Sequence, residues 1–148
     1  MKLAHRVHTA ASPAQVWELL GSPDRWPSFD PLLHRVRGAS GRAVAGQHLL
    51  GVSRGVGLRI PVDVVECVPE QRLRLVVRTL PGVSQEELFE LTPALRGGCD
   101  ISVSLVVEGV FARAAVLPLW AASGVTARLL AAQTDKLARS RRRSRGVA

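Results

Sequence analysis

The sequence predicts an α+β domain in which one curved antiparallel sheet of seven strands wraps around a long C-terminal helix, with two short helices between the first two strands. Three observations lead to this prediction. Residues 2–9 alternate like a strand, residues 12–27 carry the signals of two short helices, and residues 32–108 hold β-type segments separated by short turns. After Gly109 the apolar period becomes helical, and this last segment is the only element long enough to cover the sheet.

The two short helices have clear boundaries in the sequence. Ser12 is a suitable N-cap, Pro13 suits the first helical position, and Gln15 completes a capping box by bonding back to the cap. Gly21 ends this helix, and a second, shorter helix spans residues 22–27. The chain therefore passes through two helices before the sheet continues.

The remaining strands are expected to form a meander. The segments between them are short and rich in turn residues such as Gly, Pro and Ser, which favours antiparallel pairing of consecutive strands. We expect six strands here, at residues 32–37, 47–52, 58–68, 72–80, 86–92 and 99–108.

The final helix is expected to end near Leu137. Pro118 and Gly124 lie within it, so we expect either a late start of the regular helix or a kink near Pro118. The domain then covers residues 1–138. Residues 139–148 contain five arginines, which supply five of the eight net positive charges, and we expect this basic tail to be disordered.

The composition argues against a membrane-spanning or secreted protein and against a metal or disulfide framework. No run approaches the roughly 18 uninterrupted apolar residues of a membrane span, and the N-terminus does not resemble a signal peptide, so we expect a cytoplasmic protein. Cys67 and Cys99 are the only cysteines, which fits neither a zinc framework nor a disulfide scaffold. His5 and His8 fall on opposite faces of the first strand. We therefore expect no metal and no cofactor.

The predicted architecture favours an internal cavity. A curved sheet and a straight helix cannot stay in contact along their whole length, and walls of Val, Leu, Ile and Phe would favour an apolar ligand. Trp26 and Phe29 suit the mouth of this cavity, because loops can move there. We expect the cavity to be bounded by Trp26, Phe29, Phe89, Leu91, Val103, Leu105 and Trp120.

Several short motifs, in their order along the chain, resemble one protein family. These are residues 11–20, 24–27 with Phe29, 68–73, 89–93 before Gly97 and Gly98, and 108–109. Up to about Leu137, the chain resembles the START-like (SRPBCC) superfamily with its helix-grip fold, and within it the bacterial polyketide cyclase/dehydrase and lipid-transport group. The resemblance implies a cavity for a hydrophobic ligand, but it does not select one, because the same fold serves many functions.

The resemblance also implies which residues line the cavity. Aromatic polyketide cyclases of the superfamily use a tyrosine and an arginine, whose places fall near Leu33 and Cys67 in this chain. Neither residue can supply the same chemistry, which argues against cyclisation by that route. Arg78 or Thr79 takes the place of a further polar cavity residue. We therefore expect Leu33, Cys67 and Thr79 in the ligand-binding set.

The strand at residues 58–68 has two candidate registers. Its apolar alternation turns one set inward: Leu58, Ile60, Val62 and Val64. The resemblance turns the other set inward: Pro61, Asp63, Val65 and Cys67. Only a β-bulge accommodates both halves.

Three polar residues are candidate catalytic groups. Asp30 and His34 follow the aromatic turn, and Asp63 becomes a cavity carboxylate under the second register. A histidine beside a carboxylate suits general acid-base catalysis. Each also has a structural interpretation. Asp30 precedes a proline in a turn, His34 can lie on the outer face of its strand, and Asp63 alternates with valines as a solvent-facing residue does.

We expect the protein to bind or carry a hydrophobic small molecule, such as a lipid, a quinone or a polyketide-like compound. The alternative is an enzyme of the lyase or isomerase type, a polyketide cyclase, dehydratase or aromatase that uses the same cavity. A charged or imidazole group buried against the ligand would favour the enzyme, and an almost wholly apolar pocket would favour the carrier.

The basic tail suggests a partner. An anionic membrane surface is the natural partner for five arginines on a protein with lipid-like cargo. Nucleic-acid binding ranks last, because the tail lacks interleaved aromatic residues and a folded basic face. The sequence identifies neither the ligand nor the oligomeric state.

Overall fold

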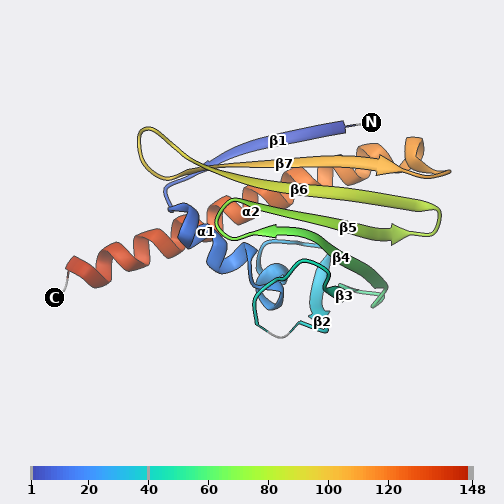
Figure 1. Ribbon diagram of the computed structural model, residues 1–148, viewed down its shortest axis with the longest axis horizontal. Helices are drawn as coiled ribbons and strands as arrows, with labels where there is room; N and C mark the ends of the chain where they lie inside the picture. Colours follow the sequence, from blue (N-terminus) through green and yellow to red (C-terminus); the bar gives the residue numbers. More distant parts are fainter. Residues whose placement is uncertain (1, 40, 147–148) are drawn as a thin grey trace.

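The computed structural model describes residues 2–39 and 41–146 of the chain. Over these residues, seven strands form one antiparallel sheet in the order β1-β7-β6-β5-β4-β3-β2 (Figure 1). From β2 to β7 each strand pairs with the next along the chain, so the predicted meander is confirmed. The strands are β1 (Lys2–Thr9), β2 (Leu33–Arg37), β3 (His48–Ser53), β4 (Arg59–Val68), β5 (Arg72–Leu80), β6 (Val83–Pro93) and β7 (Cys99–Glu108).

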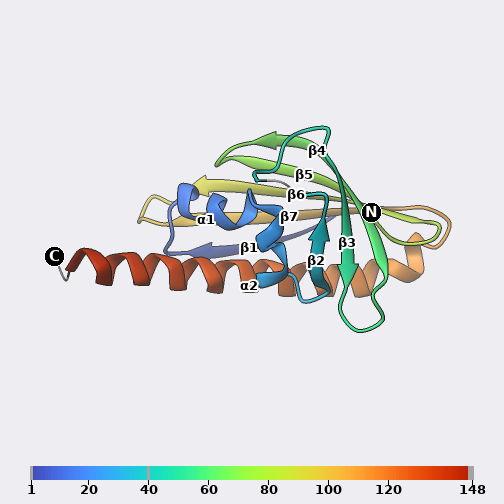
Figure 2. The same ribbon diagram turned by 90° about the horizontal axis from the view of Figure 1, so that it is seen from below.

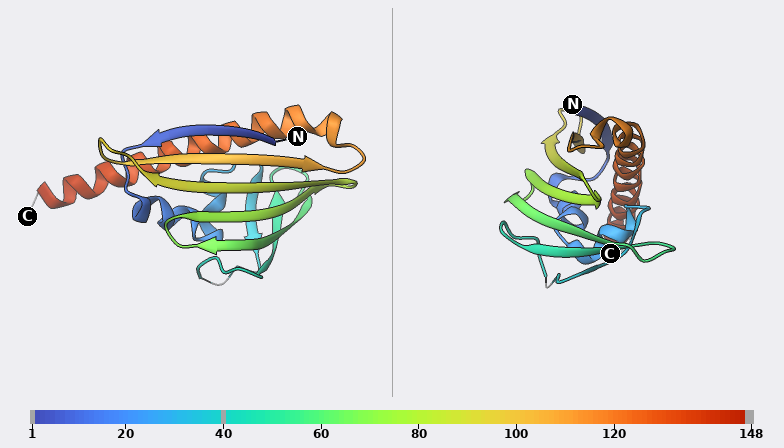
Figure 3. Two further views of the ribbon diagram at one scale, coloured as in Figure 1. Left: turned by 45° about the horizontal axis from the view of Figure 1, so that its top comes forward. Right: turned by 90° about the vertical axis from the view of Figure 1, so that its right-hand side faces the viewer.

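The helices cover one face of this sheet. The long helix α2 (Ala112–Gly146) lies along β1 and β7, and the sheet curves around it and around the two short helices (Figures 2 and 3). These are α1 (Pro13–Leu20) and the 3₁₀ helix η1 (Pro23–Ser28). The predicted helix-grip architecture is therefore confirmed. We expect the cavity between β4, β5, β6 and α2.

The boundaries of α1 follow from its sequence. The Gln15 N–H donates to Ser12 Oγ over 3.2 Å, and the Ser12 N–H donates to Gln15 Oε1 over 3.0 Å, so the predicted capping box is present. The Gly21 N–H then donates to the Trp17 carbonyl at the C-terminal end. Helix η1 includes Pro27 and ends at Ser28, slightly beyond its predicted end.

Strand β6 begins earlier than predicted. Its first residue is Val83 rather than Glu86, because Pro81 and Gly82 make a tight turn that pairs Leu80 directly with Val83. Gly82 has a φ of +73°, which glycine adopts without a steric penalty. The earlier start adds Val83 and Gln85 to the strand, and Gln85 contributes to the site described below.

Strand β4 contains the bulge that its two candidate registers required. Ile60, Val62 and Val64 are buried, as the apolar alternation predicts. The pairing with β5 then shifts between Val64 and Glu66, and after this shift Cys67 packs against the core. The first register is therefore correct up to Val64, whereas the second is correct only at Cys67, because Val65 at the bulge is exposed. Leu58 lies outside the strand with an exposed side chain.

Helix α2 excludes one of the two alternatives predicted for its start, and it extends beyond its predicted end. It begins at Ala112 and contains Pro118, so the late start is not observed. It also continues past Leu137 to Gly146, so the prediction of a disordered tail is wrong for residues 139–146, while residues 147–148 lie outside the described residues. Arginine has a high helix propensity, and positive charge in a last turn interacts favourably with the helix dipole. Arg141 also forms a 2.7 Å ion pair with Glu18 of α1.

A fully paired polar cluster joins the end of β1 to α2. The Thr9 hydroxyl contacts Thr134 Oγ1 at 2.9 Å and donates to Asp135 Oδ1 over 2.8 Å. The Ala10 N–H donates to the same carboxylate oxygen over 2.7 Å. Because these groups satisfy one another, their burial costs little, and they fix α2 against the edge of the sheet. We call Thr9, Thr134 and Asp135 the closed-end cluster.

Candidate functional site

An internal cavity of about 60 Å³ lies between β4, β5, β6, η1 and α2. Most of its walls are apolar, with Trp26, Leu33, Ile60, Val62, Leu75, Val77 and Leu119 contributing side chains. A second space of about 30 Å³ adjoins it, shares six lining residues with it, and extends to Leu20, Phe29, Leu73 and Phe89. Together they hold a few water-sized molecules.

One wall of the cavity is polar and comes mainly from β6. Successive inward positions of this strand are Val83, Gln85, Glu87, Phe89 and Leu91. The Thr79 hydroxyl donates to Gln85 Oε1 over 3.2 Å, and the Gln85 amide donates to Glu87 Oε1 over 2.7 Å. This chain of hydrogen bonds sets the orientation of the Gln85 amide and ends on a carboxyl group at the centre of the cavity wall.

A second carboxyl group, Asp30, faces the same cavity from the segment between η1 and β2. Burial raises the pKa of Asp30 above its ordinary value, and the N–H groups of Leu32 and Leu33 and the charge of Arg54 oppose this rise. The Leu32 N–H donates to Asp30 Oδ1 over 2.9 Å. The ionised form of Asp30 therefore has local partners.

Glu87 is in a different environment. Burial is the main reason that its pKa rises to about 7, the negative charge of Asp30 adds to the rise, and the hydrogen bond from Gln85 opposes it. Protonated and ionised forms of Glu87 are therefore both populated at neutral pH. Two carboxyl groups that face one cavity, one of them with a pKa near 7, can act as an acid and a base. We call Thr79, Gln85, Glu87 and Asp30 the cavity cluster.

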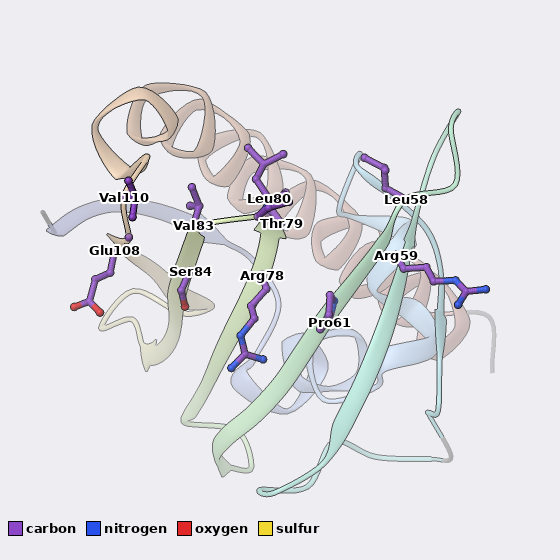
Figure 4. Close-up of a pocket in the computed structure, with 13 residues that line it drawn as sticks. Leu58, Arg59, Pro61, Arg78, Thr79, Leu80, Val83, Ser84, Glu108 and Val110 are labelled. Carbon is purple, nitrogen blue, oxygen red and sulfur yellow. The ribbon is translucent and has the colours of Figure 1, made fainter.

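An open groove of about 830 Å³ lies beside the cavity, where β4 and β5 separate (Figure 4). The two strands pair only as far as Val62 and Val77 at this end, and the groove occupies the space beyond that pair. Thr79 borders both the groove and the internal cavity. Ser84 of β6, Glu108 at the end of β7 and Val110 in the connection between β7 and α2 also line the groove.

The structure brings together half of the predicted ligand-binding residues. Those that line the cavity or its extension are Trp26, Phe29, Leu33, Thr79 and Phe89, together with the catalytic candidate Asp30. The Trp26 indole N–H donates to the Leu20 carbonyl over 2.8 Å, which fixes the ring against the cavity. Leu91, Val103 and Leu105 are buried, but they belong to the packed core and do not line the cavity.

Two other predicted residues lie outside the cavity. Trp120 is 40% exposed and stacks on His5 of β1 with ring centroids 4.9 Å apart, so the prediction that it bounds the cavity is wrong. The helical period instead directs Leu119 and Ser123 toward the cavity. Cys67 is half-buried, and its Sγ donates to the Ala43 carbonyl away from the cavity.

Asp63 and His34 are not cavity residues either. Asp63 lies on the outer face of β4, where its carboxylate contacts His48 Nδ1 at 2.6 Å and Arg78 at 3.3 Å. The hydrogen bond from His48 is the main reason that the pKa of Asp63 is lowered. His34 is exposed on β2. The hypothesis of a cavity carboxylate at Asp63 is therefore wrong, because the bulge that turns Cys67 toward the core lies beyond it.

Sequence reasoning missed Gln85 and Glu87. The signal was present in the alternation of β6, because two-residue steps back from the inward Phe89 and Leu91 reach Glu87 and then Gln85. Within residues 2–39 and 41–146, no three His, Cys, Asp or Glu side chains converge as metal ligands would. The polar groups of the cavity can instead donate and accept hydrogen bonds and transfer protons.

The family model for polyketide cyclase/dehydrase and lipid transport matches residues 1–141. The chain belongs to this family. No curated protein matches it in sequence.

Solved structures share its fold. A protein from Nitrosospira multiformis superposes with a TM-score of 0.75 at 14% identity over 94% of this chain and 99% of its own. Ara h 8.0201 gives 0.69 at 11% identity, covering 90% of this chain and 97% of its own. DynU16, from the dynemicin biosynthetic locus, gives 0.67 at 19% identity over 87% of this chain and 46% of its own. At these identities the likeness shows the fold alone.

Proposed function

We propose that this protein binds a small hydrophobic molecule that carries one hydrogen-bonding polar group, such as a lipid, a quinone or a polyketide-like compound. The observation that carries the proposal is a cavity with mostly apolar walls, in which Thr79, Gln85 and Glu87 form a chain of hydrogen bonds along one wall and the Asp30 carboxyl faces the same space. The family to which the chain belongs supports a hydrophobic ligand. The apolar walls would supply affinity and the polar wall would orient the ligand.

The ligand would enter from the open groove. A cavity of about 60 Å³ is far below the roughly 300 Å³ of ordinary ligand sites, so the closed cavity accommodates only part of such a molecule. The groove of about 830 Å³ has the required size, and Thr79 borders both spaces. The apolar body would rest between β4 and β5, and its polar group would reach Gln85 and Glu87.

Ligand binding is tested with a naphthoquinone probe and with a fluorescent fatty acid, by quenching of Trp26, which lines the cavity. Ala122 lines the cavity and Ala121 is its exposed neighbour on α2. Ala122→Leu should weaken binding by at least tenfold, and Ala121→Leu should leave it unchanged. Binding that is equal in both variants, or absent from the unmodified protein for every probe, contradicts the proposal. Native mass spectrometry of protein from its own host would identify the ligand class.

The cavity cluster favours a second candidate function, acid-base catalysis on the bound ligand. A buried ionisable group was the feature expected to distinguish an enzyme from a carrier, and Glu87 is such a group. The Asp30 carboxylate would take a proton from a carbon next to a carbonyl while the protonated Glu87 gives its proton to the carbonyl oxygen, which yields an enol. Such a step suits a cyclase or dehydratase.

The test of this candidate is exchange of ligand α-protons with deuterated solvent, followed by NMR on a cyclic ketone probe. The unmodified protein should accelerate exchange, and Asp30→Asn and Glu87→Gln should each abolish the acceleration while the probe still binds. If the protein binds the probe without accelerating exchange, the carrier function stands and the catalytic one fails.

A further inference from the structure

Helix α2 carries most of the net positive charge of the chain. It contains eight Arg or Lys residues and one acidic residue, Asp135, whereas the whole chain has a net charge of +8. The acidic residue belongs to the closed-end cluster and accepts hydrogen bonds from Thr9 and Ala10. The rest of the chain is therefore close to neutral, and the positive charge is concentrated on one continuous helix.

The solvent-facing side of α2 divides into an apolar part and a basic part. A single stripe at helical spacing begins with exposed Ala114, Leu117, Pro118, Ala121 and Val125. The same stripe continues with exposed Arg128, Ala132, Lys136, Arg139 and Arg143. We call this stripe the outer face of α2. Leu117 is 70% exposed and Val125 is 42% exposed, and they lie on one stripe with other apolar residues rather than singly.

The apolar part extends beyond the helix. Val110 and Phe111, in the connection that leads into α2, are 87% and 61% exposed. Figure 2 shows that the C-terminal part of α2 projects beyond the sheet. By length and composition α2 could span a membrane, but half of its apolar window is buried within the domain. The uncovered half therefore suits a helix that lies on a surface rather than one that crosses it.

We propose that the outer face of α2 binds the surface of an anionic lipid bilayer. Leu117 and Val125, with Val110 and Phe111, would enter the boundary between headgroups and acyl chains. Arg128, Arg139 and Arg143 would contact the anionic headgroups. An apolar segment followed by basic residues on one helix face is the arrangement that interfacial helices use. The proposal goes beyond ligand binding, because the outer face of α2 lies on the side of the helix away from the cavity, and of the residues named here only Val110 also borders the open groove.

Charge favours an anionic bilayer over two other partners for this face, a second copy of the chain and a nucleic acid. In a parallel pair of chains the basic parts of two outer faces would repel each other, and in an antiparallel pair each basic part would cover the apolar part of its partner. Neither arrangement neutralises the arginines. A nucleic acid would neutralise them but would leave Leu117 and Val125 without an apolar contact. An anionic bilayer offers both contacts at once.

The test is co-flotation of the full chain with vesicles of phosphatidylcholine and phosphatidylglycerol, at about 50 mM and about 500 mM salt. Leu117→Gln with Val125→Gln removes the apolar contact, and Arg128→Gln with Arg139→Gln and Arg143→Gln removes three charges. The matched controls are Val44→Gln with Leu95→Gln, and Arg35→Gln with Arg37→Gln and Arg96→Gln, all exposed residues outside α2. Circular dichroism melts establish that each variant folds.

The unmodified protein should bind the anionic vesicles at low salt and lose most binding at high salt. The triple arginine variant on α2 should bind roughly a hundredfold more weakly, at about fivefold per charge. The apolar variant should lose binding at least tenfold, and both controls should retain it. The proposal is overturned if controls and α2 variants lose binding equally, or if light scattering shows a dimer that only the α2 variants dissociate. Binding to a DNA duplex that the apolar variant leaves unchanged, without vesicle binding, also overturns it.

Discussion

Two polar clusters lie between the sheet and α2, and they differ in what they face. In the closed-end cluster, Thr9, Thr134 and Asp135 satisfy one another within packed side chains. In the cavity cluster, Thr79, Gln85 and Glu87 form a chain of hydrogen bonds along the wall of an open space, with Asp30 opposite. The two clusters use similar residue types, and only the surrounding space distinguishes them.

A buried polar group with a structural role differs from one with a functional role in the space beside it. A buried polar group with all its partners in the protein contributes rigidity, because any change leaves a partner unsatisfied. A buried polar group beside open space can exchange its partners for those of a ligand or give up a proton. The closed-end cluster is expected to determine stability, and the cavity cluster to determine binding and pH response.

The largest expected effect comes from opening the packed region next to the cavity. Phe89 is 3% exposed and lines the smaller space, so Phe89→Ala should lower the free energy of unfolding by about 3–5 kcal/mol. The same change at exposed Phe111 should cost less than about 1 kcal/mol. Urea denaturation of both variants measures the difference. Equal losses would mean that Phe89 does not hold the packed region together.

Glu87 should make stability depend on pH. An acid whose pKa is raised on folding, here from 4.5 to about 7, favours the unfolded state once it ionises, so its contribution is intact below pH 4.5 and lost as the pH rises through 7. Relative to Glu87→Gln, the unmodified protein should lose up to about 3 kcal/mol over this range. Urea denaturation at several pH values measures it, with Glu90→Gln on the outer face of β6 as control. A difference that does not change with pH would refute the assignment.

At the closed-end cluster, Asp135→Ala should destabilise the protein by about 1–3 kcal/mol at every pH near neutrality, because it leaves the Thr9 hydroxyl and the Ala10 N–H with fewer partners. Asp100→Ala is the matched control, since it removes only an exposed contact with His8 and should cost less than about 1 kcal/mol. Thermal and urea unfolding measure both. Asp135→Ala should leave ligand affinity unchanged, and a loss of affinity would show that the clusters are coupled.

The smallest expected effect on stability comes from the end of α2. Deletion of residues 139–148 removes the Arg141 to Glu18 ion pair, which is partly exposed, and should cost no more than about 1 kcal/mol. Ligand affinity should not change, because none of residues 139–146 lines the cavity. Calorimetry and the quenching titration measure these two outcomes. A loss of several kcal/mol would mean that this last part of α2 stabilises the domain.

Much of the fold could be predicted from local sequence. The capping box at Ser12 and Gln15, the alternation of β1 and the turns between strands depend on neighbouring residues, and the structure confirms them. The extent of α2 was harder to predict, because the composition of an arginine-rich segment resembles that of a disordered tail. In the structure, the preceding helix continues through this segment.

The site depended on information that the local sequence does not contain. The candidate Asp30 was found from its position after the aromatic turn, and it does face the cavity. The prediction that Asp63 faces the cavity was wrong. The position of the bulge against β5 determines which residues of β4 face inward, and this position is a property of strand pairing.

The order and type of the elements and the apolar character of the interior follow from periodicity, capping and turn chemistry, which are local properties of the chain. That Glu87 and Asp30 share one cavity follows from the packing of distant segments, and the resulting burial and proximity raise the pKa of Glu87 to about 7. The same packing leaves the apolar and basic residues of α2 as one exposed stripe. Burial and proximity arise only when distant segments pack together, and they control both proton affinity and exposure.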